Sequence, residues 1–566
     1  MKSLVAVCSF IALVLTILTP GIATANNPIQ SVFAKKLQGV VPKPQFRQTP
    51  NPYLASPLYA ITHFDSSQSD STPYGPPRGV FNVDPATKPI SYGGPINIIT
   101  LASTDKNHMW HVGEDRVGYV YSGAGHWDTL ATYEALAEAT SNALPAIPDS
   151  NFRTFGKSSA VGMDTASMDS SLKSLFNDNY ADRFGNGIYV LVDKDNVLYT
   201  NYADTLYAFA LKDPADPSAG IKVRYKLDNV VAAIQGDGAP AGTRLFGLSM
   251  TYDGHLIVAF SNGVAVLNRD LNVLSKSFYR FADDEYVSNS IAVDEHNGIY
   301  VASNSVMRKL VWTGTTLSDN ESDGAWSSPY DNSGNQLPPI IKFGNGTGST
   351  PTLMGFGNPA DQLVVITDGA KQMKLVAFWR NKIPKGFVQK PGTASRRIAG
   401  QIQVTCGFTS LPEWIQSEQS VVVNGYGAFV VNNIPETVSP DIQSANKILQ
   451  VSLMGPAYAT SHGAERFQWN PLTHEWFSVW ARPDVSSTSM VPIYSQSGKM
   501  ALINGYREPQ GWEVLGLDWY KGNTVHQTIF GDTNFGNGAY AILQYLKNDD
   551  LLFNSISGPF RVHYGQ

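Results

Sequence analysis

The chain has 566 residues, a formal net charge of −6 at pH 7 and 16% charged residues. Nucleic-acid binding depends on clustered Lys and Arg side chains, so this composition argues against a nucleic-acid partner. The 49 Gly, 34 Pro, 26 Tyr and 26 Phe residues favour an all-β fold with many turns, because aromatic residues are enriched in strands and Gly and Pro in turns.

Residues 1–25 have the pattern of a secretory signal peptide. Lys2 is followed by an apolar run from Leu4 to Thr19, and Ala23-Thr24-Ala25 is a small-x-small cleavage site. The apolar run is shorter than the roughly 20 residues that a membrane-spanning helix needs, and no later segment is apolar enough to cross a membrane. We therefore expect cleavage after Ala25 and a secreted or periplasmic monomer without a membrane span; a retained N-terminal anchor is the alternative.

Beyond residue 90 the sequence repeats one pattern of strands and turns. Its clearest copy is 247–270, where Asp253-Gly254 and Asn262-Gly263 separate three apolar runs, and both dipeptides are strong signals for β-hairpins. Eight copies can be aligned, and their first strands are predicted to start near residues 96, 188, 247, 290, 352, 420, 489 and 539.

Sheets of about four antiparallel strands repeated at such intervals are typical of a β-propeller. We predict a single propeller over residues 91–566 with eight blades; seven is the alternative, because the copy at 420 is irregular. The last copy ends after its third strand, so a closed ring needs a fourth strand from elsewhere. We expect residues 26–90 to supply it, from Tyr59–Phe64 or Val80–Val83.

Two stretches between the first and second copies depart from the strand pattern. Trp127–Asn142 and Ser167–Phe176 space their apolar residues as an α-helix does. The sequence therefore predicts a short helical insert over about residues 125–183, which is either a lid over one face of the ring or a surface elaboration.

The tetrapeptide Phe-Gly-Asn-Gly occurs three times, at 184–187, 343–346 and 535–538, each time before an apolar run. We predict that it forms the turn through which the chain enters an innermost strand, because Gly and Asn tolerate positive φ. The amides of Asn186, Asn345 and Asn537 either cap these turns or point into the mouth of the ring.

A polar rim is predicted at the mouth, the face on which the innermost strands begin. It carries more carboxylates than basic side chains, and the run Asp283-Asp284-Glu285 stands out. The loops and turns expected on this face contribute Glu114, Asp115, Asp182, Arg183, Asp204, Arg244, Asp283, Asp284, Glu285, Asn289, Asp368, Glu413, Glu418, Arg482, Asp484, Arg507, Glu508, Asp532 and Asn537. The ten histidines form no pair with the HxH or HxxxH spacing of a metal site.

Converging carboxylate and amide oxygens suit a hard cation, and Ca²⁺ takes six to eight oxygen ligands. We therefore expect Ca²⁺ or another divalent cation at the mouth, held by Asn289, Asn186 and Asn537 with nearby carboxylates.

Two blades carry a family resemblance. The stretch 288–294 (SNSIAVD) with 297–302 (NGIYVA), and the similar stretch Gly247–Phe260, resemble a recurring phrase of the SMP-30/gluconolactonase, strictosidine-synthase-like and NHL-repeat propellers. In the lactonase branch, an Asn at the position of Asn289 helps to hold a catalytic divalent metal. Those propellers usually have six blades, so the resemblance implies the fold and suggests lactonase-like chemistry at Asn289.

These observations lead to one expectation and one alternative. We expect an enzyme that acts on a small molecule at the mouth by metal-assisted hydrolysis of an ester or lactone, with Asp284 or Glu285 as general base. The alternative is a non-catalytic propeller that binds a glycan, a peptide or a partner protein through the same face.

Overall fold

Short strands separated by Gly, Asn and Asp turns build most of the protein in the computed structural model, which describes residues 44–96, 98–333, 335–357 and 361–565. The predicted signal peptide, residues 1–25, lies outside the described residues. Among the residues that are described, no helix combines the length and the apolar character needed to cross a membrane.

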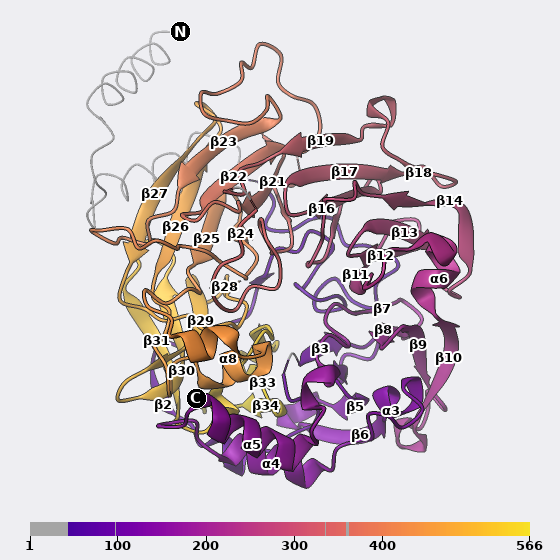
Figure 1. Cartoon of the computed structure of the whole chain (residues 1–566), viewed down its shortest axis with the longest axis vertical. Helices are drawn as coiled ribbons and strands as arrows, with labels where there is room; N and C mark the ends of the chain where they lie inside the picture. Colours follow the sequence, from indigo (N-terminus) through magenta and orange to yellow (C-terminus); the bar gives the residue numbers. More distant parts are fainter. Residues whose placement is uncertain (1–43, 97, 334, 358–360, 566) are drawn as a thin grey trace.

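Within the described residues the strands form eight sheets, which are arranged around a ring as a β-propeller (Figure 1). Seven of them are four-stranded meanders or contain one, with neighbouring strands antiparallel and the first strand innermost. The predicted starts of the first strands differ from the observed ones by no more than five residues. The prediction of an all-β propeller is therefore confirmed.

The strands of the first four sheets are β3 (Ile99–Ala102), β4 (His108–Val112), β5 (Val117–Tyr121) and β6 (Asp128–Tyr133); β7 (Leu191–Val192), β8 (Leu198–Tyr202), β9 (Thr205–Leu211) and β10 (Ile221–Asp228); β11 (Leu245–Met250), β12 (Leu256–Phe260), β13 (Gly263–Leu267) and β14 (Val273–Arg280); and β15 (Ala292–Val293), β16 (Gly298–Ala302), β17 (Val306–Trp312) and β18 (Leu317–Ser318), with β19 (Trp326–Pro329) also paired to β17.

The remaining sheets contain β20 (Thr352–Met354), β21 (Leu363–Thr367), β22 (Lys374–Trp379) and β23 (Ile398–Gln403); β24 (Val422–Asn424), β25 (Gly427–Val431), β26 (Ala464–Asn470) and β27 (Glu475–Arg482); β28 (Ile493–Ser495), β29 (Met500–Arg507), β30 (Gly511–Asp518) and β31 (Thr524–Gly531), flanked by β1 (Ser71–Thr72) and β2 (Gly79–Asn82); and β32 (Gln544–Tyr545), β33 (Leu551–Ser555) and β34 (Gly558–Val562).

Apolar side chains fill the wedges between neighbouring sheets. Between the second and third sheets, for example, Leu206 and Ala208 form one buried cluster with Leu248, Val258 and Ala265. Burial on both faces explains why these strands read as nearly continuous apolar runs rather than as alternating ones. The stability of the ring therefore comes from sheet-on-sheet packing.

The N-terminal segment closes the ring in a different place from the one predicted. Ile90 forms a bridge with Phe560 of β34, and the Ser91 amide donates to Pro559 O at 3.1 Å. The stretch beginning at Ile90 thus takes the fourth-strand position of the last sheet. Val80–Val83 largely coincides with β2 instead, which extends the preceding sheet in parallel with β31.

Residues 59–72, here called the axial segment, run through the centre of the ring, where their indigo trace is visible in Figure 1. Their carbonyls accept hydrogen bonds from the innermost strands of successive sheets, at distances of 2.7 to 3.1 Å. The donors include the amides of Ala102, Val192, Val293, Leu353, Val423 and Tyr494. An innermost strand has no neighbouring strand on the side of the axis. The carbonyls of the axial segment supply the hydrogen-bond acceptors that such a strand would provide.

The α-helices of the described residues are α3 (Ala135–Ala139), α4 (Asp149–Lys157), α5 (Thr165–Phe176), α6 (Val230–Gln235), α7 (Pro440–Ser444) and α8 (Lys447–Leu453). The predicted helix at Ser167–Phe176 is confirmed as α5, whose N-cap Asp164 accepts the Ser167 amide. Helices α4, α5 and α8 lie close together (Figure 1) over one shared apolar cluster.

One local prediction was wrong. Most of Trp127–Asn142 is not helical, because Asp128–Tyr133 pairs with β5 as the fourth strand of its sheet and only Ala135–Ala139 forms a helix. Here the pairing partner, not the local apolar pattern, decided the structure. The irregular copy that starts near residue 420 contains helix α8, whose N-cap Asn446 accepts the Leu449 amide.

Candidate active site

A cavity of about 700 Å³ opens at the face where the innermost strands begin. Its walls come from the loops that enter β7, β11, β15, β20, β24, β28 and β32, and its floor includes Thr62 and His63 of the axial segment. Partly enclosed cavities with a few polar groups among aromatic side chains are typical ligand sites. We call it the mouth cavity.

Two of the three Phe-Gly-Asn-Gly turns meet at this cavity. The rings of Phe184 and Phe343 stack with centroids 4.8 Å apart, and the ring of Tyr540 lies 4.9 Å from that of Phe343. All three side chains line the cavity. We call them the aromatic cluster.

The third turn has another role. Phe535 is completely buried, and a Cβ atom on Gly156 of α4 would lie only 2.1 Å from its ring. The phenylalanine of this copy is therefore part of the core, and glycine at position 156 makes room for it.

Glu418, in the loop before β24, is a buried carboxyl group of the cavity wall with little hydrogen-bond support. Oε1 accepts the Phe343 amide at 3.4 Å, whereas Oε2 is buried without a hydrogen-bond partner among the described residues. Burial raises the pKa of Glu418 to about 8, opposed by the charges of Lys342 and Lys447. Near pH 7 this side chain is therefore mainly a neutral acid.

The floor carries a histidine held by a carboxylate. Nδ1 of His63 lies 2.9 Å from both carboxylate oxygens of Asp70, and the ring of Tyr189 lies over the imidazole at 5.9 Å. Burial raises the pKa of Asp70 to about 6, against the lowering effect of His63. Because Asp70 occupies Nδ1, Nε2 is the nitrogen left for a ligand.

The three asparagines predicted to hold a metal lie in three different environments. Asn186 lines the cavity, but its Nδ2 donates to Arg183 O at 2.6 Å and its Oδ1 accepts the Ala203 amide at 2.7 Å, so it caps its own turn. Asn289 is buried and donates to Ala302 O at 3.2 Å. Asn537 is also buried and donates to Val451 O at 2.8 Å.

The two predicted catalytic carboxylates line an adjoining open cleft of about 510 Å³, which shares Thr243 and Tyr286 with the mouth cavity. Asp284 is exposed there. Glu285 is paired with Arg308 through contacts of 2.5 and 2.6 Å; burial acts to raise its pKa, but the Arg308 and Ser303 hydrogen bonds outweigh this and lower it. A carboxylate stabilised in this way is a weak base.

A divalent cation is implied by the family resemblance, and the residues do not fit one. Among the described residues, no group of three or more His, Cys, Asp or Glu side chains comes together in a way that could hold a metal ion. The unpartnered Oδ1 atoms of Asn289 and Asn537 thus have no carboxylates grouped around them, and we derive no step through a metal.

The sequence pointed to the rim but not to its chemistry. Glu418 was one of many rim carboxylates, and only the burial produced by its neighbours distinguishes it. His63 and Asp70 lie seven residues apart. His63 falls in Tyr59–Phe64, one of the two predicted closing strands, and Asp70 lies beyond it, so no local pattern indicated their contact.

No protein-family model matches the chain. It is 31% identical over 319 residues to an uncharacterized protein of Archaeoglobus fulgidus, a match that covers 53% of this chain and 57% of the relative. The chain thus spans a little more than half the length of that relative.

Among solved structures the chain is similar to BamB of Moraxella catarrhalis, with a TM-score of 0.41 and 12% identity over 84% of this chain and 100% of that one. It is also similar to the periplasmic gluconolactonase PpgL of Pseudomonas aeruginosa, with a TM-score of 0.35 and 13% identity over 61% of this chain and 85% of that one. The assignment as a β-propeller depends on the strand topology described above.

Proposed function

We propose that this protein is an exported β-propeller enzyme that binds a small molecule in the mouth cavity and hydrolyses an ester or lactone bond by general acid–base catalysis. Glu418 is the general acid, and His63 is the general base. The observation that carries the proposal is the buried Glu418 carboxyl, whose Oε2 has no hydrogen-bond partner among the described residues, in a cavity whose floor carries the His63–Asp70 pair. Its burial raises the pKa of Glu418 to about 8.

In the proposed reaction, Nε2 of His63 removes a proton from a water molecule, whose oxygen attacks the substrate carbonyl carbon. Asp70 stabilises the imidazolium that forms, through its contact with Nδ1 at 2.9 Å. Glu418 donates its proton to the alkoxide oxygen as the carbon–oxygen bond breaks. The products are a carboxylic acid and an alcohol, and a proton passed from the imidazolium to Glu418 restores both groups.

A second candidate function is supported by the aromatic cluster. Phe184, Phe343 and Tyr540 present ring faces at the cavity, and such faces bind the apolar sides of sugar rings without any chemical step. The second candidate is therefore a propeller that binds a glycan at the mouth.

The experiment that tests the first proposal compares hydrolysis of a panel of lactones and aryl esters by the wild type, Glu418→Gln and Glu413→Gln. Glu413 lies in the same loop, but its side chain is 70% exposed, so it is a matched control. The proposal predicts that Glu418→Gln lowers kcat/KM by about 10²-fold or more and that Glu413→Gln leaves it unchanged.

Equal activity of all three proteins would contradict the assignment of Glu418. Absence of hydrolysis together with binding of an oligosaccharide, lost in Phe343→Ala, would favour the second candidate.

A further inference from the structure

Lys342 is an ammonium group enclosed by protein oxygens. The residue is completely buried, and its Nζ donates to Thr347 O at 2.6 Å, Ser417 O at 3.0 Å and Gly346 O at 3.2 Å. A fourth acceptor, Oε1 of Gln416, lies at 2.7 Å. We call these four acceptors the oxygen cage.

The oxygen cage joins two loops that enter neighbouring innermost strands. Two of its carbonyls belong to the loop before β20, which includes the Phe-Gly-Asn-Gly turn of Phe343, and the other two oxygens belong to the loop before β24, which includes Glu418. The ammonium therefore ties together the loop that carries Phe343 of the aromatic cluster and the loop that carries the proposed acid, Glu418.

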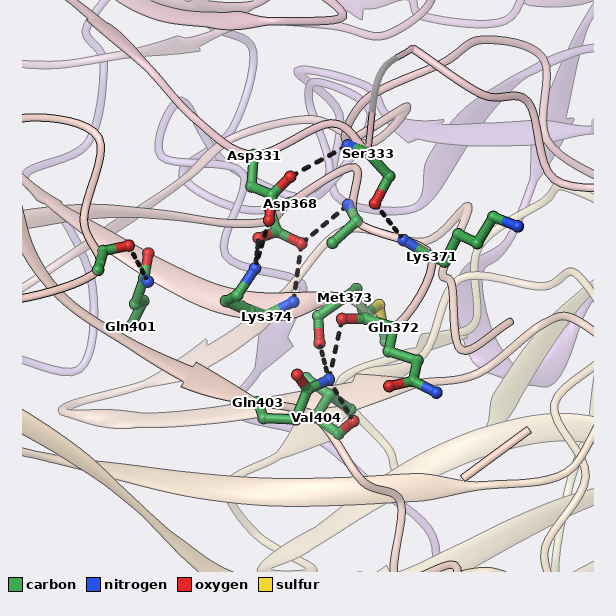
Figure 2. A network of polar contacts seen from close by, with 12 residues as sticks. Asp331, Ser333, Asp368, Lys371, Gln372, Met373, Lys374, Gln401, Gln403 and Val404 are labelled. Carbon is green, nitrogen blue, oxygen red and sulfur yellow. Dashed lines mark hydrogen bonds and ion pairs between the residues drawn. The ribbon is translucent and has the colours of Figure 1, made fainter. Parts of the chain in front are cut away.

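The Gln416 side chain is itself fixed by hydrogen bonds to a neighbouring turn. Its Nε2 donates to Asp368 O at 3.2 Å and to Ala370 O, both in the turn after β21. Figure 2 shows how this turn is fixed: Asp368 accepts the Lys374 amide at 2.8 Å, and the Lys374 ammonium bridges Asp368 and Asp331. The cage oxygen of Gln416 is thus preorganised.

Four acceptors are more than a neutral amine can serve, because it has only two N–H donors, whereas an ammonium has three. Burial lowers the pKa of Lys342 to about 8, opposed by the charges of Glu418 and Asp368. At pH 7 the group is therefore mainly a buried cation, in contact with oxygens as a bound monovalent ion would be.

We propose that Lys342 is a positioning residue. Its ammonium group occupies a site that fits a small monovalent cation, and there it holds together the loops of Phe343 and Glu418. When the side chain is removed, the oxygen cage binds free cations of the same chemistry, such as methylammonium, ammonium or K⁺.

Gly348 shows how close Lys342 and Glu418 lie. A Cβ atom on Gly348 would be 3.1 Å from Nζ of Lys342 and 3.2 Å from Oε2 of Glu418. The positive charge therefore stabilises the ionised form of Glu418 and keeps its pKa from rising further. This part of the proposal depends on the function proposed above, whereas the oxygen cage does not.

The first test compares the thermal unfolding of Lys342→Ala, wild type and Lys371→Ala as methylammonium is added. Lys371, paired with Glu413 at the surface, controls for general salt effects. We expect methylammonium to raise the unfolding temperature of Lys342→Ala alone, by a few degrees once the concentration is well above Kd. Tetramethylammonium, which has no N–H donors and is too large for the cage, should have no effect. An equal response of all three proteins would overturn the proposal.

The second test uses Lys342→Met, which removes the charge with little change in length. Its unfolding temperature should not respond to methylammonium, and the alkaline limb of its kcat/KM profile should move to higher pH, because Glu418 loses a nearby positive charge. If the alkaline limb does not move, the charge of Lys342 does not affect the pKa of Glu418. The assignment of Glu418 as the acid is unaffected by that result. If Glu418→Gln keeps full activity, the proposed function is wrong. Binding of methylammonium to Lys342→Ala still tests whether the oxygen cage is a cation site.

If neither variant folds, a protein that retains Lys342 carries the test. In protein with ¹⁵N-labelled lysine ammonium groups, one resonance protected from solvent exchange should remain after Lys309→Arg, which removes another buried lysine. Loss of every protected ammonium signal in that variant would overturn the proposal.

Discussion

Asp70 and His63 form a buried hydrogen-bonded pair within a single stretch of chain, with His63 Nδ1 2.9 Å from Asp70 Oδ1. Both belong to the axial segment, and the Asp70 carbonyl accepts the Tyr494 amide of β28 at 2.9 Å. The pair is thus fixed by backbone hydrogen bonds to the ring, so the imidazole has a fixed orientation at the floor of the cavity.

The first prediction concerns this orientation. Asp70→Asn should lower kcat/KM for ester or lactone hydrolysis by about 10²-fold or more, because an amide can present its NH₂ group to Nδ1 and favour the wrong imidazole tautomer. The matched control is Asp361→Asn: burial raises the pKa of Asp361 to about 6 as well, but its carboxylate accepts from Trp469 Nε1 at 2.7 Å outside the cavity. Equal losses in both variants would mean that stability, not orientation, is responsible.

The second prediction is a bell-shaped pH dependence of kcat/KM. The acidic limb should follow ionisation of Asp70, whose pKa is raised to about 6, because the ionised carboxylate supports the imidazole as a base. The alkaline limb should follow loss of the Glu418 proton near pH 8. Activity should therefore be greatest between these values, and a profile that keeps rising above pH 9 would contradict the assignment of Glu418.

The third prediction concerns stability. The folded pKa of Glu418, about 8, lies above its unfolded value, so the native state binds the extra proton and stability falls as pH rises from about 4.5 to about 8. Glu418→Gln removes this pH-dependent loss of stability. In denaturant titrations, the free energy of unfolding of the variant should therefore rise relative to that of the wild type across this pH range. The gain is about 1.4 kcal/mol for each unit of pKa difference at most. Glu413→Gln should show no such trend.

The fourth prediction separates the copies of Phe-Gly-Asn-Gly. Phe535→Ala should destabilise the fold by about 3–5 kcal/mol, because Phe535 is completely buried. Phe343→Ala should leave stability nearly unchanged and weaken ligand binding at the mouth roughly 3- to 10-fold, the range expected for one aromatic contact. Chemical denaturation and ligand titration of both variants would measure this, and similar losses of stability in the two would contradict the division.

The fold could be predicted because its signals are local. Turns such as Asp253-Gly254, where Gly254 has a φ of 88°, indicate each hairpin within a few residues. The repetition of these hairpins along the chain then indicates a ring of sheets. Where the local pattern was ambiguous, pairing with another strand determined the secondary structure. Asp128–Tyr133 is a strand because it pairs with β5, and nothing within that stretch reveals the pairing.

The site was harder to predict, because its properties arise from contacts between loops far apart in the chain. Phe343 and Glu418 are neighbours only once the loops before β20 and β24 meet. The path of the axial segment brings His63 under them. A carboxylate run such as Asp283-Asp284-Glu285 is conspicuous in sequence, yet ion pairing with Arg308 lowers the pKa of Glu285 and makes it a poor base.

The last prediction tests whether the axial segment organises the innermost strands. Asp65 holds the segment together, because its carboxylate accepts from the Ser67 amide at 3.0 Å and the Ser69 hydroxyl at 2.7 Å. Asp65→Ala should therefore loosen the carbonyls of Ser67 and Ser69, which accept the amides of Leu353 and Val423. Losing about 1–3 kcal/mol of local support should speed hydrogen exchange of these two amides roughly 5- to 150-fold.

The third sheet provides the control, because among the described residues it receives no backbone hydrogen bond from residues 59–72. The amides that pair β12 with β13, such as those of Val258 and Ala265, should keep their wild-type exchange rates in Asp65→Ala. If all these amides accelerate together, Asp65 supports global stability, and the axial segment has no separate role. If only Leu353 and Val423 accelerate, the floor of the mouth cavity is held by hydrogen bonds that the N-terminal segment brings to the axis.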